Sequence, residues 1–242
     1  MRTPRRLTAL TIALAGSLLG TSGAHAEFTT GGCLAQKSKV WGNLRKCQRT
    51  EGAKQLLGAT ADLAKCQTKF QIKLTTIDEK ASTAGVPCRY GDNGDNTVTD
   101  YDTGLMWVKL TGLDGVPQPY ILDADDYWDW KTAIEVASAL SGPSYEGTAI
   151  QPVPGNGLHV DWRLPNIIEL ESIADENAPG CGSGSPCIDP IFGPTAVTDY
   201  YWSSTTILPD TGEAWCVEFY GGGVVGVGKT FSGHVRAVRS GL

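Results

Sequence analysis

An acidic and aromatic stretch could bind a sugar or a cation. It joins three carboxylates to two aromatic rings: Asp123, Asp125, Asp126, Tyr127 and Trp128. Aromatic rings can stack on the apolar face of a sugar, and carboxylates accept hydrogen bonds from hydroxyl groups. A structural role is the alternative, because acidic residues favour the first turn of a helix. A helical apolar spacing does follow, from Trp130 to Leu140, so both interpretations stay open.

A second acidic stretch invites comparison with calcium sites. Its carboxylates are Asp92, Asp95, Asp100 and Asp102. An EF-hand loop needs an oxygen ligand at position 3 and a Glu at position 12. A loop starting at Asp92 has Gly94 and Thr103 at those positions, so the pattern does not match. Asp-Asn-Gly and Asp-Thr-Gly strings are typical of turns. We therefore expect polar hairpin turns and assign no metal or cofactor, with calcium left as an option that no motif supports.

Groups suited to catalysis are scarce. Beyond residue 26 the histidines are His159 and His234, and no H-E-x-x-H, G-x-S-x-G or C-x-x-C string occurs. A nucleophile needs an adjacent base, and metal catalysis needs several ligands. We therefore predict that the protein is not an enzyme, although carboxylates paired in space are invisible in a sequence.

The N-terminus predicts export. Three arginines precede an apolar run from Leu7 to Leu19, and Ala24-His25-Ala26 fits a cleavage site. The run is shorter than the ~20 residues of a spanning helix, and no later stretch is longer. We expect residues 1–26 to be a signal peptide. The mature chain would lack a transmembrane segment and reside in the periplasm or at the cell exterior.

Residues 27–87 are expected to form a helical hairpin. Apolar residues recur at helical spacing from Cys33 to Cys47 and again from Leu63 to Ala81, with a turn near Gly58. Two short helices bury little area, so such a hairpin needs additional links. A coiled coil with a partner chain and a metal site are the alternatives.

Disulfides are the expected links, because an exported chain meets an oxidising compartment. An antiparallel hairpin brings Cys47 near Cys66 at its closed end, and Cys33 would then meet Cys88 at its open end. Cys181 and Cys187 lie in a Gly- and Ser-rich string that can close a local disulfide. The seven cysteines leave at least one over.

Charge separates this hairpin from the rest of the chain. Residues 27–87 carry ten Lys and Arg against five Asp and Glu, whereas residues 88–242 carry seven against 21. The division supports a domain boundary near Cys88. It also argues against nucleic acid or an anionic membrane as the partner of the larger part, since phosphates require a basic surface.

The larger part combines short helices with strands. Alternation from Val160 to Leu164 predicts a strand, and Pro165 is placed to begin a short helix whose apolar side is Ile167, Leu170 and Ile173. Later strands are expected over residues 200–206, 214–220, 224–230 and 234–239. We therefore predict an α+β fold.

Four strings in the larger part resemble a known family. They are D-N-G-D-N-T-V-T-D-Y-D-T-G-L-M-W, D-W-R-L-P-N-I-I-E-L, Y-W-S-S-T, and A-W-C-V-E-F followed by V-R-A-V-R. Their order and spacing are similar to the C-terminal domain of the Legionella collagen-like adhesin, the Lcl C-terminal domain family, over residues 88–242. The resemblance implies a C-type-lectin-like α+β architecture, also seen in formylglycine-generating enzymes. It further implies adhesion, since the named member is a trimeric adhesin that binds sulfated glycosaminoglycans.

The sequence departs from that family in two respects. Members often have a cysteine where this chain has Ala237, so the resemblance implies that Cys216 lacks its usual partner. Sulfated polymers require clustered basic residues, which residues 88–242 lack. A neutral glycan, a protein partner or a cation-bridged ligand fits this charge better.

The resemblance also suggests where a ligand would bind. Candidate residues lie within or near the matching strings: Asp126, Trp128, Arg163, Trp202 and Trp215. For each tryptophan the alternative is a place in the core. We predict an exported, non-catalytic binding or adhesion module for a glycan or a surface protein. The alternatives are an assembly protein of the cell envelope, with the hairpin forming a homo-oligomer, and, less favoured, an enzyme of the formylglycine-generating-like fold.

Overall fold

The computed structural model describes residues 28–110, 127–140, 159 and 161–241. The expected signal peptide and the candidate Asp126 lie outside these residues. The described chain is an α+β protein with two antiparallel sheets and an N-terminal helical hairpin. Of the helices in this described portion, none is both long and apolar enough to cross a bilayer.

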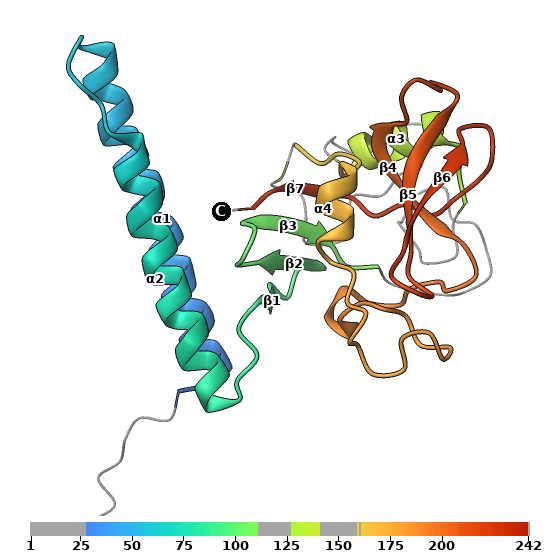
Figure 1. The fold of residues 1–242 in the computed structure, drawn as a ribbon, viewed down its shortest axis with the longest axis horizontal. Helices are drawn as coiled ribbons and strands as arrows, with labels where there is room; N and C mark the ends of the chain where they lie inside the picture. Colours follow the sequence, from blue (N-terminus) through green and yellow to red (C-terminus); the bar gives the residue numbers. More distant parts are fainter. Residues whose placement is uncertain (1–27, 111–126, 141–158, 160, 242) are drawn as a thin grey trace, which may run out of the picture.

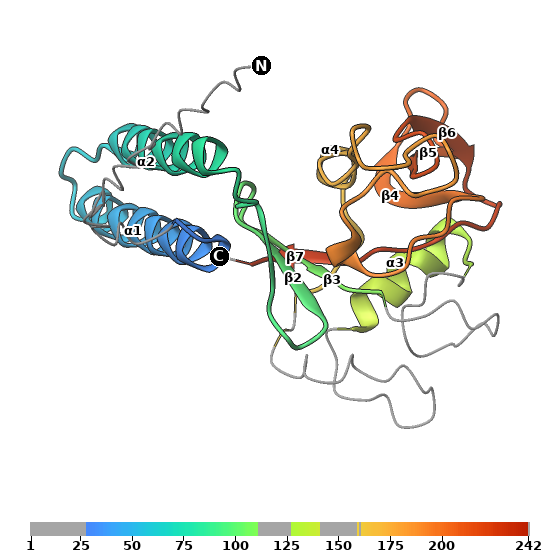
Figure 2. The ribbon, with the colours of Figure 1, turned by 90° about the horizontal axis from the view of Figure 1, so that it is seen from below.

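The predicted hairpin consists of α1 (Thr30–Leu56) and α2 (Leu63–Ala84). The Thr29 side chain caps α1 by accepting from Gly32 N–H, and Asp62 caps α2 by accepting from Lys65 N–H. Gly85 ends α2 in a left-handed conformation (φ 64°). The helices lie side by side (Figure 2). Their shared apolar core includes Val40, Leu44, Phe70, Leu74 and Ile77.

All three expected disulfides are confirmed. Cys33–Cys88 and Cys47–Cys66 each have a Cα–Cα distance of 5.8 Å, and Cys181–Cys187 has one of 4.6 Å. Cys216 is a free, buried cysteine. The hairpin is therefore closed near its turn and tied to the following domain at its open end.

The first sheet has the strand order β1 (Tyr90–Asp92), β2 (Thr97–Asp100), β3 (Leu105–Val108) and β7 (Val238–Ser240). The second has the order β4 (Tyr200–Thr206), β5 (Glu213–Glu218) and β6 (Val224–Gly228). Three short helices accompany them: α3 (Trp130–Ala139), α4 (Ile167–Glu171) and the 3₁₀ helix η1 (Pro190–Phe192). One core, which includes Trp107, Trp202, Phe192 and Val238, joins both sheets.

Two expected elements differ from the structure. No strand forms over residues 161–164; Arg163 makes an isolated bridge to Val238 instead, although Trp162 and Leu164 are buried as their alternation predicts. The strand expected over residues 234–239 is reduced to Val238–Ser240 and pairs with β3 in the first sheet. The preceding residues lie in the core, where His234 bonds to Tyr200 and Trp202. Apolar alternation reports burial, and here the chain is buried without continuous ladder pairing.

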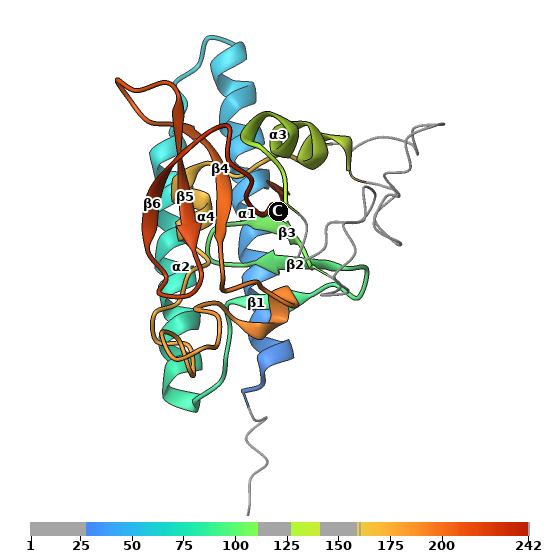
Figure 3. The same ribbon diagram turned by 90° about the vertical axis from the view of Figure 1, so that its right-hand side faces the viewer.

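The hairpin stands on one side of the domain, and the β4–β6 sheet lies on the other (Figures 1 and 3). The buried Lys37 side chain of α1 forms ion pairs with Asp78 of α2 and Asp102 in the β2–β3 turn. Trp41 Nε1 donates to the carbonyl of Tyr101 at 2.8 Å. These contacts fix the N-terminal half of α1, and with it the open end of the hairpin, against the first sheet.

Candidate binding surface

The side of the β4–β6 sheet that carries Trp215 offers exposed apolar groups. In the register of β5 and β6, Glu213 pairs with Gly228 and Trp215 pairs with Gly226. Side chains alternate along a strand, and directly paired residues share a face. Glu213 and Trp215 therefore project from the same face on which β6 presents two glycines.

Those glycines leave room for side chains from neighbouring loops. A Cβ on Gly226 would lie 2.6 Å from Ile207 Cδ1, and a Cβ on Gly228 would lie 3.1 Å from the Phe231 ring. Ile207 and Phe231 thus lie over β6 on the Trp215 side. We call Ile207, Glu213, Trp215, Val224 and Phe231 the outer face.

The outer face is open to solvent. The exposed fractions are 63% for Phe231 and 36% for both Trp215 and Val224. Hydrogen bonds hold the segment after β6 in place, because Phe231 N–H donates to Gly228 O and Lys229 Nζ donates to Thr206 Oγ1 at 2.8 Å. Grouped, exposed apolar side chains on a soluble domain often mark an interaction site.

Trp128 and Trp202 form a separate cluster at the start of α3. Trp128 exchanges backbone hydrogen bonds with Gly233, and its carbonyl accepts from Trp202 Nε1 at 2.8 Å. Trp202 has an exposed fraction of 0%, so its ring offers no surface to a ligand. Trp128 is half-buried, whereas Tyr127 is 44% exposed and donates to Asp199 Oδ2 at 3.0 Å.

Arg163 is exposed but occupied. Its guanidinium donates to both carboxylate oxygens of Glu169, at 2.7 and 2.6 Å. Glu169 also accepts from Asn166 N–H, which completes a capping box at the start of α4. The hydrogen bonds with Glu169 raise the pKa of Arg163. Burial acts to raise the pKa of Glu169, but the hydrogen bonds from Arg163 and Asn166 N–H outweigh it, so the pKa of Glu169 is lowered. In this structure Arg163 fixes the entry to α4.

The candidate residues therefore do not form one site. Of the candidates that the structure describes, Trp215 alone lies on the outer face, beside Ile207 and Phe231, which the sequence analysis missed. The G-V-G-K-T-F string held a usable signal, because alternate glycines in a strand indicate close approach by other groups. Which loop supplies those groups depends on the tertiary fold.

The second acidic stretch is a pair of hairpin turns, as expected. Asp92 Oδ1 accepts from Gly94 N–H and its Oδ2 pairs with Lys109 Nζ at 2.7 Å. Asp95 accepts from the Thr97 N–H. Within the described ranges, no group of three or more His, Cys, Asp or Glu side chains could hold a metal ion.

A proline-lined hollow of about 480 Å³ lies beside the Cys181–Cys187 loop. Its walls include Pro179, Pro186, Pro190 and Pro194, and no charged side chain lines it. A site of this kind lacks charged groups to orient a ligand, so the outer face is the better candidate.

A protein-family comparison now identifies the domain. The model of the Lcl C-terminal domain matches residues 96–239, more than half of the chain. The chain belongs to this family. Within the Lcl C-terminal domain lie both sheets except β1 and the end of β7, while the α1–α2 hairpin precedes the match. No curated protein sequence matches the chain.

Proposed function

We propose that this protein is an exported, non-catalytic binding or adhesion module whose outer face binds a glycan. The observation that carries the proposal is the exposed pair Trp215 and Phe231. Trp215 projects from β5 on the face where β6 presents Gly226 and Gly228, and Phe231 lies over Gly228. An adhesin-associated family, the Lcl C-terminal domain, agrees with a binding role.

The outer face has suitable groups for sugar recognition. The Trp215 and Phe231 rings can stack on the apolar face of a sugar ring, and the Glu213 carboxylate can accept hydrogen bonds from hydroxyl groups. The domain from Cys88 onward is strongly acidic, so a sulfated polymer would be repelled. A neutral glycan is therefore the ligand class that fits.

The absence of catalysis is part of the proposal. The Cys216 thiol is buried, and burial raises its pKa, which disfavours the reactive thiolate. His234 is buried and stacks on Tyr201 at 4.9 Å between ring centroids. Neither group is placed to meet a substrate at the surface.

Export and fold type complete the proposal. The three disulfides are compatible with an oxidising compartment. We place the mature protein in the periplasm or at the cell surface, after removal of residues 1–26. The combination of two small antiparallel sheets with short helices supports a C-type-lectin-like architecture for the Lcl C-terminal domain.

A surface protein is the second candidate ligand, and β6 favours it. Among the described strands, β6 pairs only with β5. Glu218 N–H donates to Gly223 O and Lys229 N–H donates to Gly212 O. Hydrogen-bonded and non-hydrogen-bonded pairs alternate along an antiparallel ladder, so the backbone N–H and C=O groups of Val224 and Gly226 point away from β5. An uncharged edge strand can accept an added strand from a partner.

A glycan array tests the proposal, with the chain from Glu27 onward as the probe, in calcium and again in chelator. We expect saturable binding to a neutral glycan, lost in the Trp215→Ala/Phe231→Ala variant. Tyr220→Ala is the matched control, since Tyr220 is 49% exposed and lies outside the outer face. Loss of binding in chelator would instead show a cation-bridged ligand. Binding that survives the double substitution would contradict the assigned surface.

A further inference from the structure

The closed end of the hairpin exposes large apolar side chains. Leu56 ends α1 with an exposed fraction of 90%, Leu57 follows at 85%, and Leu63 begins α2 at 47%. We call these three leucines the hairpin tip. They are excluded from the hairpin core, which consists of residues nearer the base. Exposed leucines grouped at a projecting end indicate a site that contacts another apolar surface.

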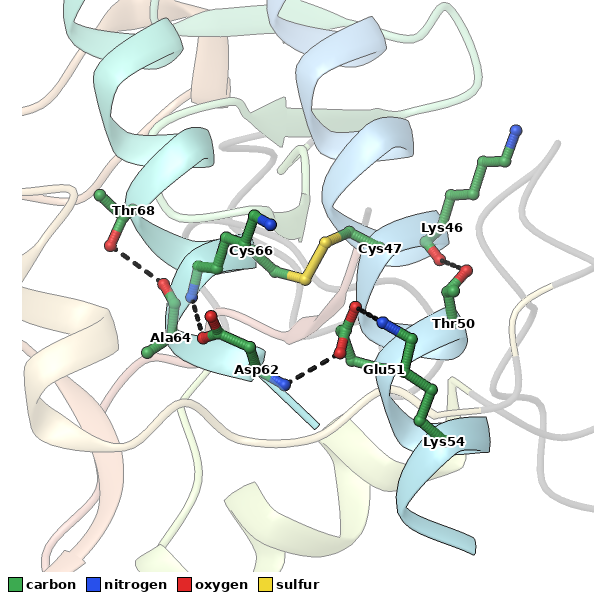
Figure 4. Close-up of a disulfide and its surroundings, with 10 residues drawn as sticks. Lys46, Cys47, Thr50, Glu51, Lys54, Asp62, Ala64, Cys66 and Thr68 are labelled. Atoms are coloured by element: carbon green, nitrogen blue, oxygen red, sulfur yellow. Dashed lines mark hydrogen bonds and ion pairs between the residues drawn. A yellow bond between two sulfur atoms is a disulfide. The ribbon is translucent and has the colours of Figure 1, made fainter. Parts of the chain in front are cut away.

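Basic side chains line the part of the hairpin that leads to the tip. They are Arg45, Lys46, Arg49, Lys54, Lys65 and Lys69. The acidic residues of the same region, Glu51 and Asp62, are engaged locally. Glu51 accepts from Lys54 Nζ at 2.7 Å and from Asp62 N–H at 2.9 Å, and Asp62 caps α2 (Figure 4). Arg45, Lys46, Arg49 and Lys69 form no ion pair within the described part of the chain. The end of the hairpin is thus strongly basic.

The hairpin holds this end away from the acidic domain. Lys37 and Trp41 attach the base of α1 to the first sheet, whereas the tip projects at the opposite end (Figure 1). The Cys47–Cys66 disulfide locks the two helices close to the tip. From Trp41 to Leu56 the helix rises about 22 Å, which keeps the leucines clear of the carboxylates of the larger domain.

The size of the tip argues against a stable protein interface. Three leucines offer on the order of 300 Å² of apolar surface, whereas a stable interface buries about 800 Å² on each partner. Contact between two tips would also bring two basic ends together. A lipid surface needs no such area, because apolar residues enter the headgroup boundary while basic residues meet anionic headgroups.

We propose that the hairpin tip inserts shallowly into the surface of an anionic lipid bilayer. Leu56 and Leu57 enter the boundary between headgroups and acyl chains, and Arg49 and Lys65 meet the headgroup phosphates. The Lcl C-terminal domain, which lies beside the hairpin, stays outside the bilayer (Figure 1). This inference is independent of the glycan proposal, because it involves other residues and another ligand class.

Co-sedimentation with lipid vesicles tests the inference. The chain from Glu27 onward, which lacks the apolar N-terminal run, is mixed with phosphatidylcholine vesicles containing 30% phosphatidylglycerol, and with vesicles of phosphatidylcholine alone. We expect half-maximal binding to the anionic vesicles at a lipid concentration at least tenfold lower than on the neutral ones.

Two variants separate the apolar contribution from the charge. Leu56→Ser/Leu57→Ser and Arg49→Gln/Lys65→Gln should each weaken binding to anionic vesicles at least tenfold. Their matched controls are Leu208→Ser, at a leucine that is 79% exposed, and Lys131→Gln, at a lysine side chain that is 85% exposed. Both controls should bind like the parent chain. Unchanged far-ultraviolet circular dichroism and Tm establish that each variant is folded.

Three results would overturn the inference. The first is no sedimentation of the parent chain with anionic vesicles. The second is loss of binding in the charge variant with none in the leucine variant, which would show a site for anions in general. The third is a dimer in lipid-free ultracentrifugation that the leucine substitutions abolish, which would assign the tip to a second copy of the chain.

Discussion

Single side chains join the hairpin to the domain. Lys37 is buried on α1, yet its ammonium group reaches a carboxylate on α2 and another in the β2–β3 turn. Gly104 permits the closest approach at this junction: its φ is +75°, and a Cβ there would lie 2.6 Å from the Trp41 ring. The ion pairs of Lys37 and the close packing of Trp41 on Gly104 therefore stabilise the same junction.

Loss of the Lys37 ammonium should destabilise the junction. We expect Lys37→Ala to lower the free energy of unfolding by about 1–3 kcal/mol, because Asp78 and Asp102 lose a charged hydrogen-bonding partner. Both carboxylates keep some solvent contact, which limits the loss. Urea titration measures the effect, with the exposed Lys39→Ala as control. Equal midpoints for the two variants would show that the ion pairs contribute nothing.

Two glycine substitutions should act in opposite directions. Gly104→Ala forces a side chain into a left-handed conformation and against Trp41, so we expect a loss of at least about 1 kcal/mol. Gly52 lies inside α1, and a Cβ there meets nothing within 4 Å. Gly52→Ala should therefore stabilise by about 0.5–1 kcal/mol. Thermal denaturation distinguishes them, and a stable Gly104→Ala variant would refute the close packing.

At the scale of elements, α4 shows how a five-residue helix can be held. Asn166 and Glu169 form its capping box, and Arg163 clamps Glu169 from the preceding segment. Ile167 N–H is bonded by Thr205 Oγ1 of β4, so the second sheet also supports the helix start. Such a short helix depends on these external bonds, because its own hydrogen bonds are few.

The Arg163–Glu169 pair should make stability depend on pH. The pKa of Glu169 is lower in the folded chain than its ordinary value, so the folded state binds this proton less readily than the unfolded state. The stabilisation is present above the ordinary carboxyl pKa of about 4.3 and is lost as pH falls through the folded value. Tm measured from pH 7 to pH 3 should show wild type above Glu169→Gln at neutral pH, with the gap closing in acid. A gap of the same size at pH 3 as at pH 7 would rule out this linkage.

Local patterns predicted the elements better than they predicted the site. Helical spacing is a local relation and gave the α1–α2 hairpin. An antiparallel hairpin then fixes which cysteines meet, even for Cys33 and Cys88, which lie 55 residues apart. The strand expected over residues 161–164 was wrong, since alternation reports that one side of the chain is buried, whether or not a ladder forms. Trp215 was predicted as a ligand residue, and that prediction still awaits a test. Its neighbours Ile207 and Phe231 reach the outer face from the β4–β5 loop and from the segment after β6, and only the tertiary fold brings these two segments together.

At the scale of the whole molecule, charge and shape divide the chain into two parts. A basic hairpin lies on one side of an acidic Lcl C-terminal domain, and the β4–β6 sheet, which carries the outer face, lies on the other (Figure 3). Two separate surfaces can engage two partners at once. On our proposals the hairpin tip contacts a lipid surface while the outer face contacts a glycan.

The most direct test of the central claim is glycan binding by the Trp215→Ala/Phe231→Ala variant beside the parent chain and Tyr220→Ala. The account predicts that the parent and Tyr220→Ala bind the same neutral glycan saturably, and that the double variant loses at least tenfold in affinity while keeping its Tm. Equal binding by all three proteins, or no glycan bound by the parent with or without calcium, would contradict it.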